Sequence, residues 1–235
     1  MKTKFSLLAL LLCLCQLASA QTADTATFYR HHIGVNTRVV LDKLVDPASQ
    51  MPLQLMYKYQ LSSRTALRLS VEGMYTKSDS SRSYIDRLDE VTHYTYGGGL
   101  GYERQRPLGK VLMVYYGADA FYRRQGKNTE VVNKFIEPTP NQDLMEVRAS
   151  DNHANTTIGL GPFLGLRANI GKRLYLSTET SIQLKREKKT QDFHSTSTRY
   201  HSEGAATGSS YADYTVYRNG ISYLPFNGLS IQYTF

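Results

Sequence analysis

The chain lacks most of the features that stabilise or equip small exported proteins. It contains no tryptophan, and its only two cysteines, Cys13 and Cys15, lie in an apolar stretch near the amino terminus. Without that stretch, the chain can form no disulfide, build no thiolate metal site and offer no cysteine nucleophile. Beyond residue 20 it has no long apolar run, which excludes a helical membrane protein.

The first 20 residues have the pattern of a secretory signal peptide. Lys2 and Lys4 precede an apolar core that is too short to span a membrane as a helix, and Ala18, Ser19 and Ala20 form a small-x-small cleavage signal. Both cysteines follow leucine, where a lipid-attachment site needs a small residue, so a lipoprotein is not expected. We therefore expect residues 1–20 to be cleaved and residues 21–235 to form one domain.

The chain is basic, with a net charge of +8 that becomes +6 when the two signal lysines are removed. Basic proteins often bind nucleic acid. Export argues against that partner here, and no Lys/Arg run is interleaved with aromatic residues. The positive excess fits the acidic lipids or polymers of a bacterial envelope better.

Alternation of apolar and polar residues recurs along the whole mature chain, and it predicts strands with one apolar face. The clearest example is the carboxy terminus, where Leu229, Ile231, Tyr233 and Phe235 alternate with polar residues. The predicted strands are 33–41, 53–59, 66–76, 93–103, 111–123, 156–167, 174–185 and 223–235. Their lengths suit a tilted membrane crossing. The pattern predicts an all-β fold: an eight-stranded antiparallel up-and-down transmembrane β-barrel.

The charges of the predicted strands all lie on the parity opposite to the apolar one. An outward lysine or arginine in mid-membrane would cost roughly 2–4 kcal/mol. The charged residues are therefore expected to point into the barrel, where the two signs nearly balance. They are Arg38, Lys58, Arg68, Glu72, Glu103, Asp119, Arg167, Glu179 and Lys185.

Glycine shares this inner parity with bulky aromatic residues, which is how a narrow barrel fills its interior. The glycines are Gly97, Gly99, Gly101, Gly159, Gly161 and Gly165, and the aromatics are Tyr115, Phe121, Phe163 and Tyr175. Pro162 does not suit the middle of a strand, because it has no backbone N–H to donate. We expect a β-bulge or a change of register there.

The connections alternate in length. Short turns are predicted at 62–65, 106–110 and 169–173, long polar loops at 77–92, 124–155 and 186–220, and an intermediate connection at 42–50. If both termini are periplasmic, every long loop faces the outside. Aromatic residues form two expected interfacial belts: Tyr75, Tyr94, Tyr96, Tyr122 and Tyr223 at the outer end, and Tyr59, Tyr102, Tyr233 and Phe235 at the periplasmic end.

The mature chain resembles the small outer-membrane β-barrel (porin-family) domain of the Bacteroidetes type, which is similar in architecture to outer membrane proteins A and X. The signal peptide, the terminal Tyr233-Thr234-Phe235, the glycine-rich segment 97–101 and the inward Glu179 carry the resemblance. It implies outer-membrane localisation and insertion by the barrel-assembly machinery through the strand ending at Phe235.

Each candidate site has a simpler explanation. The inward carboxylates fit ion pairs better than an acid/base pair. The histidines His93, His153, His194 and His201 lack metal-binding spacing and fit solvated loops. Residues 186–189 carry three cations that would suit lipopolysaccharide phosphates or a soluble rim equally well.

We therefore expect a non-enzymatic barrel with a plugged, ion-paired lumen, serving envelope structure or surface interaction, with no catalytic, cofactor-binding or metal site. Its partners would be outer-membrane lipids and lipopolysaccharide. One alternative is a lipid-modifying enzyme, similar to lipid A deacylases or palmitoyltransferases, for which His201, Ser202 and Glu203 are the only local cluster of suitable types. A small passive pore is the other alternative. A soluble lipid-binding barrel would need the opposite distribution of faces.

Overall fold

The computed structural model describes residues 29–37, 52–82, 86–136, 143–201, 204–225 and 229–235. The expected signal peptide, the connection 42–50 and Arg38 lie outside these residues. All of the regular structure within them is strand. The strands are β1 (His31–Asn36), β2 (Leu53–Ser62), β3 (Thr65–Arg82), β4 (Asp86–Pro107), β5 (Leu112–Ile136), β6 (Leu144–Asn169), β7 (Leu174–His201), β8 (Gly204–Leu224) and β9 (Leu229–Thr234).

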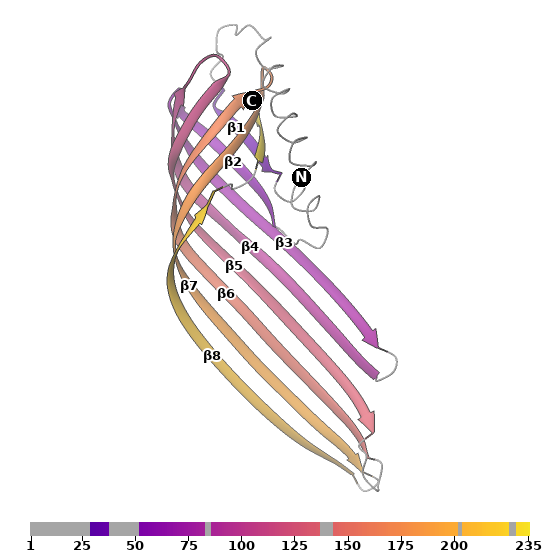
Figure 1. Cartoon of the computed structure of the whole chain (residues 1–235). Coiled ribbons are helices and arrows are strands. Elements are labelled where there is room, and N and C mark those ends of the chain that lie inside the picture. Colours follow the sequence, from indigo (N-terminus) through magenta and orange to yellow (C-terminus); the bar gives the residue numbers. More distant parts are fainter. Residues whose placement is uncertain (1–28, 38–51, 83–85, 137–142, 202–203, 226–228) are drawn as a thin grey trace, which may run out of the picture.

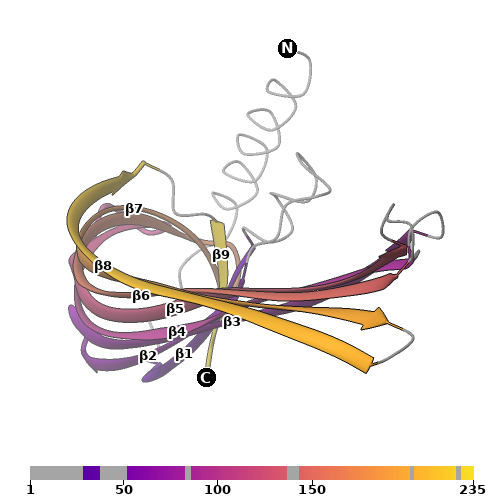
Figure 2. The ribbon, with the colours of Figure 1, turned by 90° about the horizontal axis from the view of Figure 1, so that it is seen from below.

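The strands close into an antiparallel barrel (Figures 1 and 2). Each strand from β1 to β7 pairs with the next, β7 pairs with β9, and β9 pairs back with β1, where His32 lies opposite Thr234. The ring therefore has eight positions, as the alternation predicts. Each predicted segment within the described residues lies in an observed strand.

The eighth position is shared by β8 and β9, which run in the same direction along β7. β8 pairs with the part of β7 from Ser181 onward, and β9 pairs with the part before it. Opposite residues sum to 405 in β8 and to 407 in β9, so the register shifts by two residues between them. Because an even shift keeps the side-chain parity, both strands present the same faces.

The predicted long loops are wrong. Segments 77–92, 124–155 and 186–220 continue the barrel strands as hairpins, and β7 alone is 28 residues long. Together they form a sheet that reaches away from the barrel to the lower right of Figure 1. We call this part, made of β3 from Met74 onward, β4 before Tyr96, β5 and β6 between Arg124 and Thr156, β7 from Arg186 onward and β8 up to Asn219, the upper sheet.

The predicted irregularity at Pro162 is also wrong. The β6–β7 register is the same before and after it, with Leu160 opposite Leu184 and Phe163 opposite Ser181. Only the pairs of Gly161 and Pro162 are missing from this ladder, while Pro162 stays in register with Ala118 of β5. A single absent N–H donor is accommodated without an extra residue, so the alternation of faces continues through the proline.

The short turns are where the alternation predicts them. They join β2 to β3, β4 to β5 and β6 to β7, and all lie at the end of the barrel where β1 begins and β9 ends. Thr234 accepts no strand after it, yet its N–H and that of Phe235 are bonded to the carbonyls of Arg173 and His31 at 2.9 and 3.0 Å. No helix among the described residues is long and apolar enough to cross a membrane.

The barrel has a polar interior and an apolar exterior. Leu100, Leu160 and Leu164 on the outer face are more than half exposed. On the inner face Lys58, Glu103 and Arg167 are at most 2% exposed. This distribution is the reverse of that in water-soluble domains, where charged residues are almost never fully buried.

Candidate functional site: the charged barrel interior

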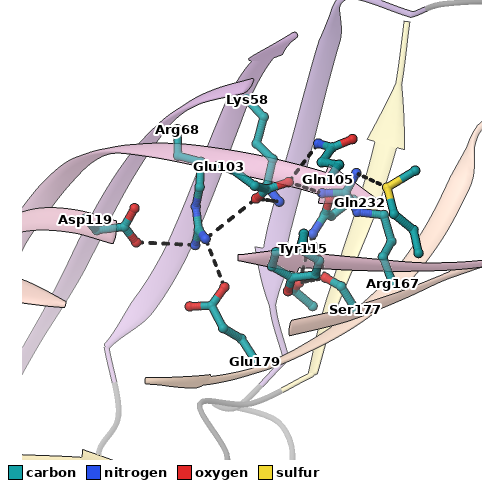
Figure 3. Close-up of polar contacts among 12 residues, drawn as sticks. Lys58, Arg68, Glu103, Gln105, Tyr115, Asp119, Arg167, Ser177, Glu179 and Gln232 are labelled. Atoms are coloured by element: carbon teal, nitrogen blue, oxygen red, sulfur yellow. Dashed lines mark hydrogen bonds and ion pairs between the residues drawn. The ribbon is translucent and has the colours of Figure 1, made fainter. Parts of the chain in front are cut away.

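Glu103 of β4 is the centre of a buried ion-pair cluster (Figure 3). Its Oε2 lies 2.6 Å from Nζ of Lys58 on β2, and its Oε1 accepts from Nη2 of Arg167 on β6 at 2.8 Å. Gln105 donates a further hydrogen bond to Oε1 at 2.7 Å. Both carboxylate oxygens are therefore occupied by donors, which leaves no free position for a substrate proton.

Arg68 of β3 connects this centre to two further carboxylates. Its Nη1 lies 3.6 Å from Oε2 of Glu103 and 3.0 Å from Oε2 of Glu179 on β7, and its Nη2 lies 3.4 Å from Oδ2 of Asp119 on β5. The cluster therefore joins three cations and three anions from six different strands. A balanced set of this kind offsets the cost of removing each charge from water.

Aromatic rings close the cluster from below and from the side. The guanidinium carbon of Arg68 lies 3.9 Å from the centre of the Phe163 ring, and Nζ of Lys58 lies 4.6 Å from the centre of the Tyr115 ring. Both rings are buried, at 5% and 2% exposure. Cations held against ring faces gain further attraction when they are desolvated.

Glycines leave the space that these rings occupy, as the inner parity predicts. A Cβ on Gly165 would stand 2.2 Å from Cζ of Tyr115, and one on Gly159 would stand 2.7 Å from Cζ of Phe121. Gly117 belongs to the same set, although the sequence-based list lacks it. Its Cβ would stand 2.8 Å from Cζ of Phe163.

Uncharged polar residues complete the interior, and the sequence analysis missed them. Nε2 of Gln232 donates to Oγ of Ser177 at 2.6 Å, and that hydroxyl lies 2.6 Å from Oγ of Ser230. These residues join β7 to β9 at the closing seam. They share the inner parity of their strands, so extending the parity rule from charged to all polar residues would have found them.

Above the cluster the interior widens into a polar cavity of about 400 Å³. Glu72 of β3 and Arg123 of β5 lie on its wall and form a bidentate pair, in which Arg123 Nη2 donates to Glu72 Oε2 at 2.9 Å. Asp119 and Glu179 also line the cavity. Lys185, predicted to neutralise an inward carboxylate, is paired with Glu187 on its own strand at 2.7 Å. Arg123 is the lumen cation that the sequence analysis missed.

The expected aromatic belts lie at the two ends of the apolar exterior. At the upper end, Tyr75 is opposite Tyr94, whose ring stacks on that of Tyr96 at 6.1 Å. At the lower end, the ring of Phe235 stacks on those of His31 and Tyr233, at 5.6 and 6.5 Å. The apolar band is thus bounded by rings at both ends.

The remaining candidates are not brought together. His201 is at the far tip of β7, where its Nδ1 lies 2.9 Å from Oδ2 of Asp143. It is 17 residues beyond Leu184, or roughly 55 Å along the strand. Ser202 and Glu203 lie outside the described residues. His153 pairs with Asp151 at 2.9 Å, and the described residues contain no group of three or more potential metal ligands.

Comparisons with known proteins identify no family. No protein-family model matches the chain, and no curated protein matches it. Two solved structures are similar in part: *Acinetobacter baumannii* CarO, at 13% identity and a TM-score of 0.35, and *Acinetobacter baumannii* CarO2, at 11% identity and a TM-score of 0.38. Each comparison covers 90% of this chain and 100% of the other. At these scores the likeness supports no conclusion about this chain.

Proposed function

We propose that the protein is a non-enzymatic β-barrel of a bacterial outer membrane. The observation that carries the proposal is the reversed distribution of side chains, with charges buried inside and leucine, isoleucine and tyrosine exposed outside. In water, an apolar surface encircling the whole barrel would drive association, because soluble proteins rarely expose apolar patches of more than a few hundred Å². In a bilayer the same surface is satisfied by lipid.

The height of the apolar band supports this proposal. On β5 the outward residues run from Leu112 to Tyr122 without a charge, and on β7 they run from Leu174 to Leu184. Eleven residues span about 35 Å along a strand, which becomes about 25 Å at the usual tilt. This is the height of the apolar band of outer-membrane barrels.

The orientation follows from the asymmetry of the two ends. We place the short turns and the terminal residue Phe235 on the periplasmic side and the upper sheet outside the cell, because barrels of this kind have short periplasmic turns. The mature chain has no cysteine of its own if residues 1–20 are cleaved, so single cysteines can report the topology.

The test compares Gly208→Cys in β8 with Gly171→Cys in the turn before β7. Intact cells are treated with a membrane-impermeant maleimide. Gly208→Cys should be labelled, whereas Gly171→Cys should be labelled only after the outer membrane is permeabilised. Labelling of Gly171→Cys in intact cells would reverse the orientation. Recovery of the unmutated protein in the soluble fraction would refute the membrane proposal itself.

We further propose that the lumen is plugged. Lys58, Glu103 and Arg167 fill one level of the barrel at 2% exposure or less, so water does not reach them. Eight strands leave an interior just wide enough for side chains. Planar bilayers containing the purified protein should show no large, steady single-channel current. Such currents would favour the alternative of a passive pore.

Assembly through the last strand is part of the proposal. Phe235 is 54% exposed and contributes little to the interior, so its role would be recognition by the barrel-assembly machinery. Deleting Phe235 should leave the chain unfolded or degraded in the periplasm. If the shortened chain reached the outer membrane at normal levels and kept its heat-modifiable migration on gels, the role of Phe235 would be refuted.

The physiological role we infer is envelope structure or surface contact, with the upper sheet as the contacting part. The resemblance to the porin-family barrels of Bacteroidetes belongs to this proposal and is supported by the Tyr233-Thr234-Phe235 terminus and the glycines 97–101. The enzyme alternative has no comparable support, because His201 lies far above the apolar band.

A further inference from the structure

Three cations project outward just above the apolar band, on the face shared by β5, β6 and β7. The cross-strand pairs place Lys188 opposite Thr156 and Thr156 opposite Arg124, so Lys188 and Arg124 are at one level, two strand spacings or about 10 Å apart. Arg186 lies two residues below Lys188, opposite Ile158. We call Arg124, Arg186 and Lys188 the outer cation row.

None of these cations is neutralised by a carboxylate among the described residues. Arg186 and Lys188 both face the ring of Tyr217 on β8, at 5.4 and 6.0 Å. Arg124 is bonded to the hydroxyl of Tyr94, while its Nε is buried without a hydrogen-bond partner. The neighbouring Glu187 points to the opposite face and is paired with Lys185. The row therefore presents positive charge and unused N–H donors to a ligand.

An open groove of about 890 Å³ begins at Arg186 and extends over the apolar band across β5 to β8. Ile158 and Leu160 of β6, Leu184 of β7 and Ile221 of β8 line it. The small side chain of Ala120 on β5 leaves the hollow between them. The groove is thus apolar along its length and cationic at its upper rim.

We infer that the outer cation row and this groove together bind one phosphate-bearing lipid of the outer leaflet. Its phosphates lie against Arg186, Lys188 and Arg124, and one acyl chain lies in the groove. Guanidinium groups suit phosphate, because they donate two parallel hydrogen bonds to its oxygens. The continuity of the groove with the lipid-facing band favours a lipid over a soluble phosphate or a protein partner. This inference rests on the proposed membrane location and adds a ligand class and a site to it.

The cations have matched controls within the same strand. Lys189 is next to Lys188 but has the opposite parity, so it faces away from the groove. We propose to measure binding of diphosphoryl lipid A to the refolded barrel by native mass spectrometry from detergent micelles. Each basic residue near an anionic lipid surface contributes about a fivefold gain in affinity. The double variant R186Q/K188Q should therefore bind roughly 25-fold more weakly, whereas K189Q should bind as the unmutated protein does.

Several results would overturn the inference. Unchanged binding by R186Q/K188Q would remove the cations from the site, and an equal loss in K189Q would reduce the effect to general charge. Competition by millimolar inorganic phosphate would identify a soluble anion as the ligand. Equal binding of a dephosphorylated lipid A would show that the acyl chains alone are recognised.

A second variant tests the groove separately. Ala120→Phe fills the hollow and leaves the outer cation row intact, so it should weaken lipid A binding several-fold while the barrel keeps its heat-modifiable migration. Normal binding by this variant would refute the position of the acyl chain. The membrane proposal has its own readout in cysteine labelling. A correctly oriented barrel that fails to distinguish lipid A from phosphatidylethanolamine would refute this inference alone.

Discussion

The same strands pass through two regions that differ in almost everything except backbone pairing. In the barrel, one face is apolar and lipid-facing by our proposal, and the other is charged and buried. In the upper sheet both faces are open, and nearly every residue of β8 is exposed. Regular antiparallel pairing continues from one region into the other, so strand formation here does not depend on an apolar face.

Electrostatics also separates the two regions. In the barrel, Glu103 is enclosed by Lys58, Arg68 and Arg167. In the upper sheet, ion pairs such as Lys77 with Glu90, at 2.8 Å, join side chains that are more than 40% exposed. Buried pairs are costly to break singly, whereas exposed pairs are screened by water and salt. Equivalent substitutions should therefore have very different effects.

Glu103→Ala should produce the largest effect. It leaves Lys58 and Arg167 desolvated without their carboxylate, which should reduce the free energy of unfolding by about 3–5 kcal/mol. Urea unfolding of the refolded barrel, followed by heat-modifiable migration, measures the change. The matched control is Glu90→Ala in the upper sheet, whose unfolding midpoint should match that of the unmutated protein. Similar losses in both variants would remove the electrostatic distinction between the regions.

Gly117→Ala should have the next largest effect. The added Cβ would stand 1.9 Å from the backbone oxygen of Tyr102, so β4 and β5 would have to move apart. Overpacking of this kind costs about 1–3 kcal/mol. The control is Gly208→Ala in β8, where the nearest atom is Oγ of Ser197 at 3.5 Å. If Gly117→Ala unfolded at the same urea concentration as Gly208→Ala, the barrel interior would be less tightly packed than the structure has it.

The two regions also differ in how well the sequence predicts them. Alternation is informative where the faces differ, and it identified the barrel strands and the inward orientation of Arg68, Glu103 and Glu179. It fails in the upper sheet, because a strand with two exposed faces needs no period-two pattern. Residues such as those of 204–210, which are alanine, glycine, serine and threonine, therefore resemble a loop.

Specific partners within the interior were less predictable than its polarity. Parity places Lys185 inside but does not reveal that Glu187, two residues further on, is its partner. Likewise, Arg123 follows the last predicted inward aromatic, and its pairing with Glu72 depends on the register between β3 and β5 across β4. Such pairings depend on barrel stagger, which the pattern of one strand does not encode.

Removing an upper hairpin should affect the barrel little. Lys127 and His153 are opposite each other in the β5–β6 ladder, so residues 128–152 can be replaced by Asn-Gly, which favours a tight hairpin turn. The shortened protein should keep its heat-modifiable migration, with a change in the free energy of unfolding within about 0.5 kcal/mol, as for other surface changes. Loss of folding would instead show that the upper sheet supports the barrel, and the comparison of independent regions would fail.

Acidification of the upper sheet should have the smallest effect. The hydrogen bond from Arg148 holds the pKa of Glu146 below its usual range, with Lys134 of the facing strand contributing in the same direction. A carboxyl group with a lowered pKa in the folded state stabilises that state above its unfolded-state pKa. This contribution is lost as the pH falls through the lowered value. Because these side chains are exposed, the loss should appear only as faster amide exchange in the β5–β6 hairpin near Lys134.

The effect can be isolated with Glu146→Gln, which has a similar shape and no titration. Amide exchange near Lys134 is measured at pH 7 and pH 3 in both proteins, after correction for the intrinsic pH dependence of exchange. The unmutated hairpin should lose protection at pH 3, and the Glu146→Gln hairpin should change less. An identical pH response in the two proteins would exclude Glu146 as its source. A simultaneous loss of protection around Glu103 would show that acid acts on the barrel first, which would reverse the expected order of the two regions.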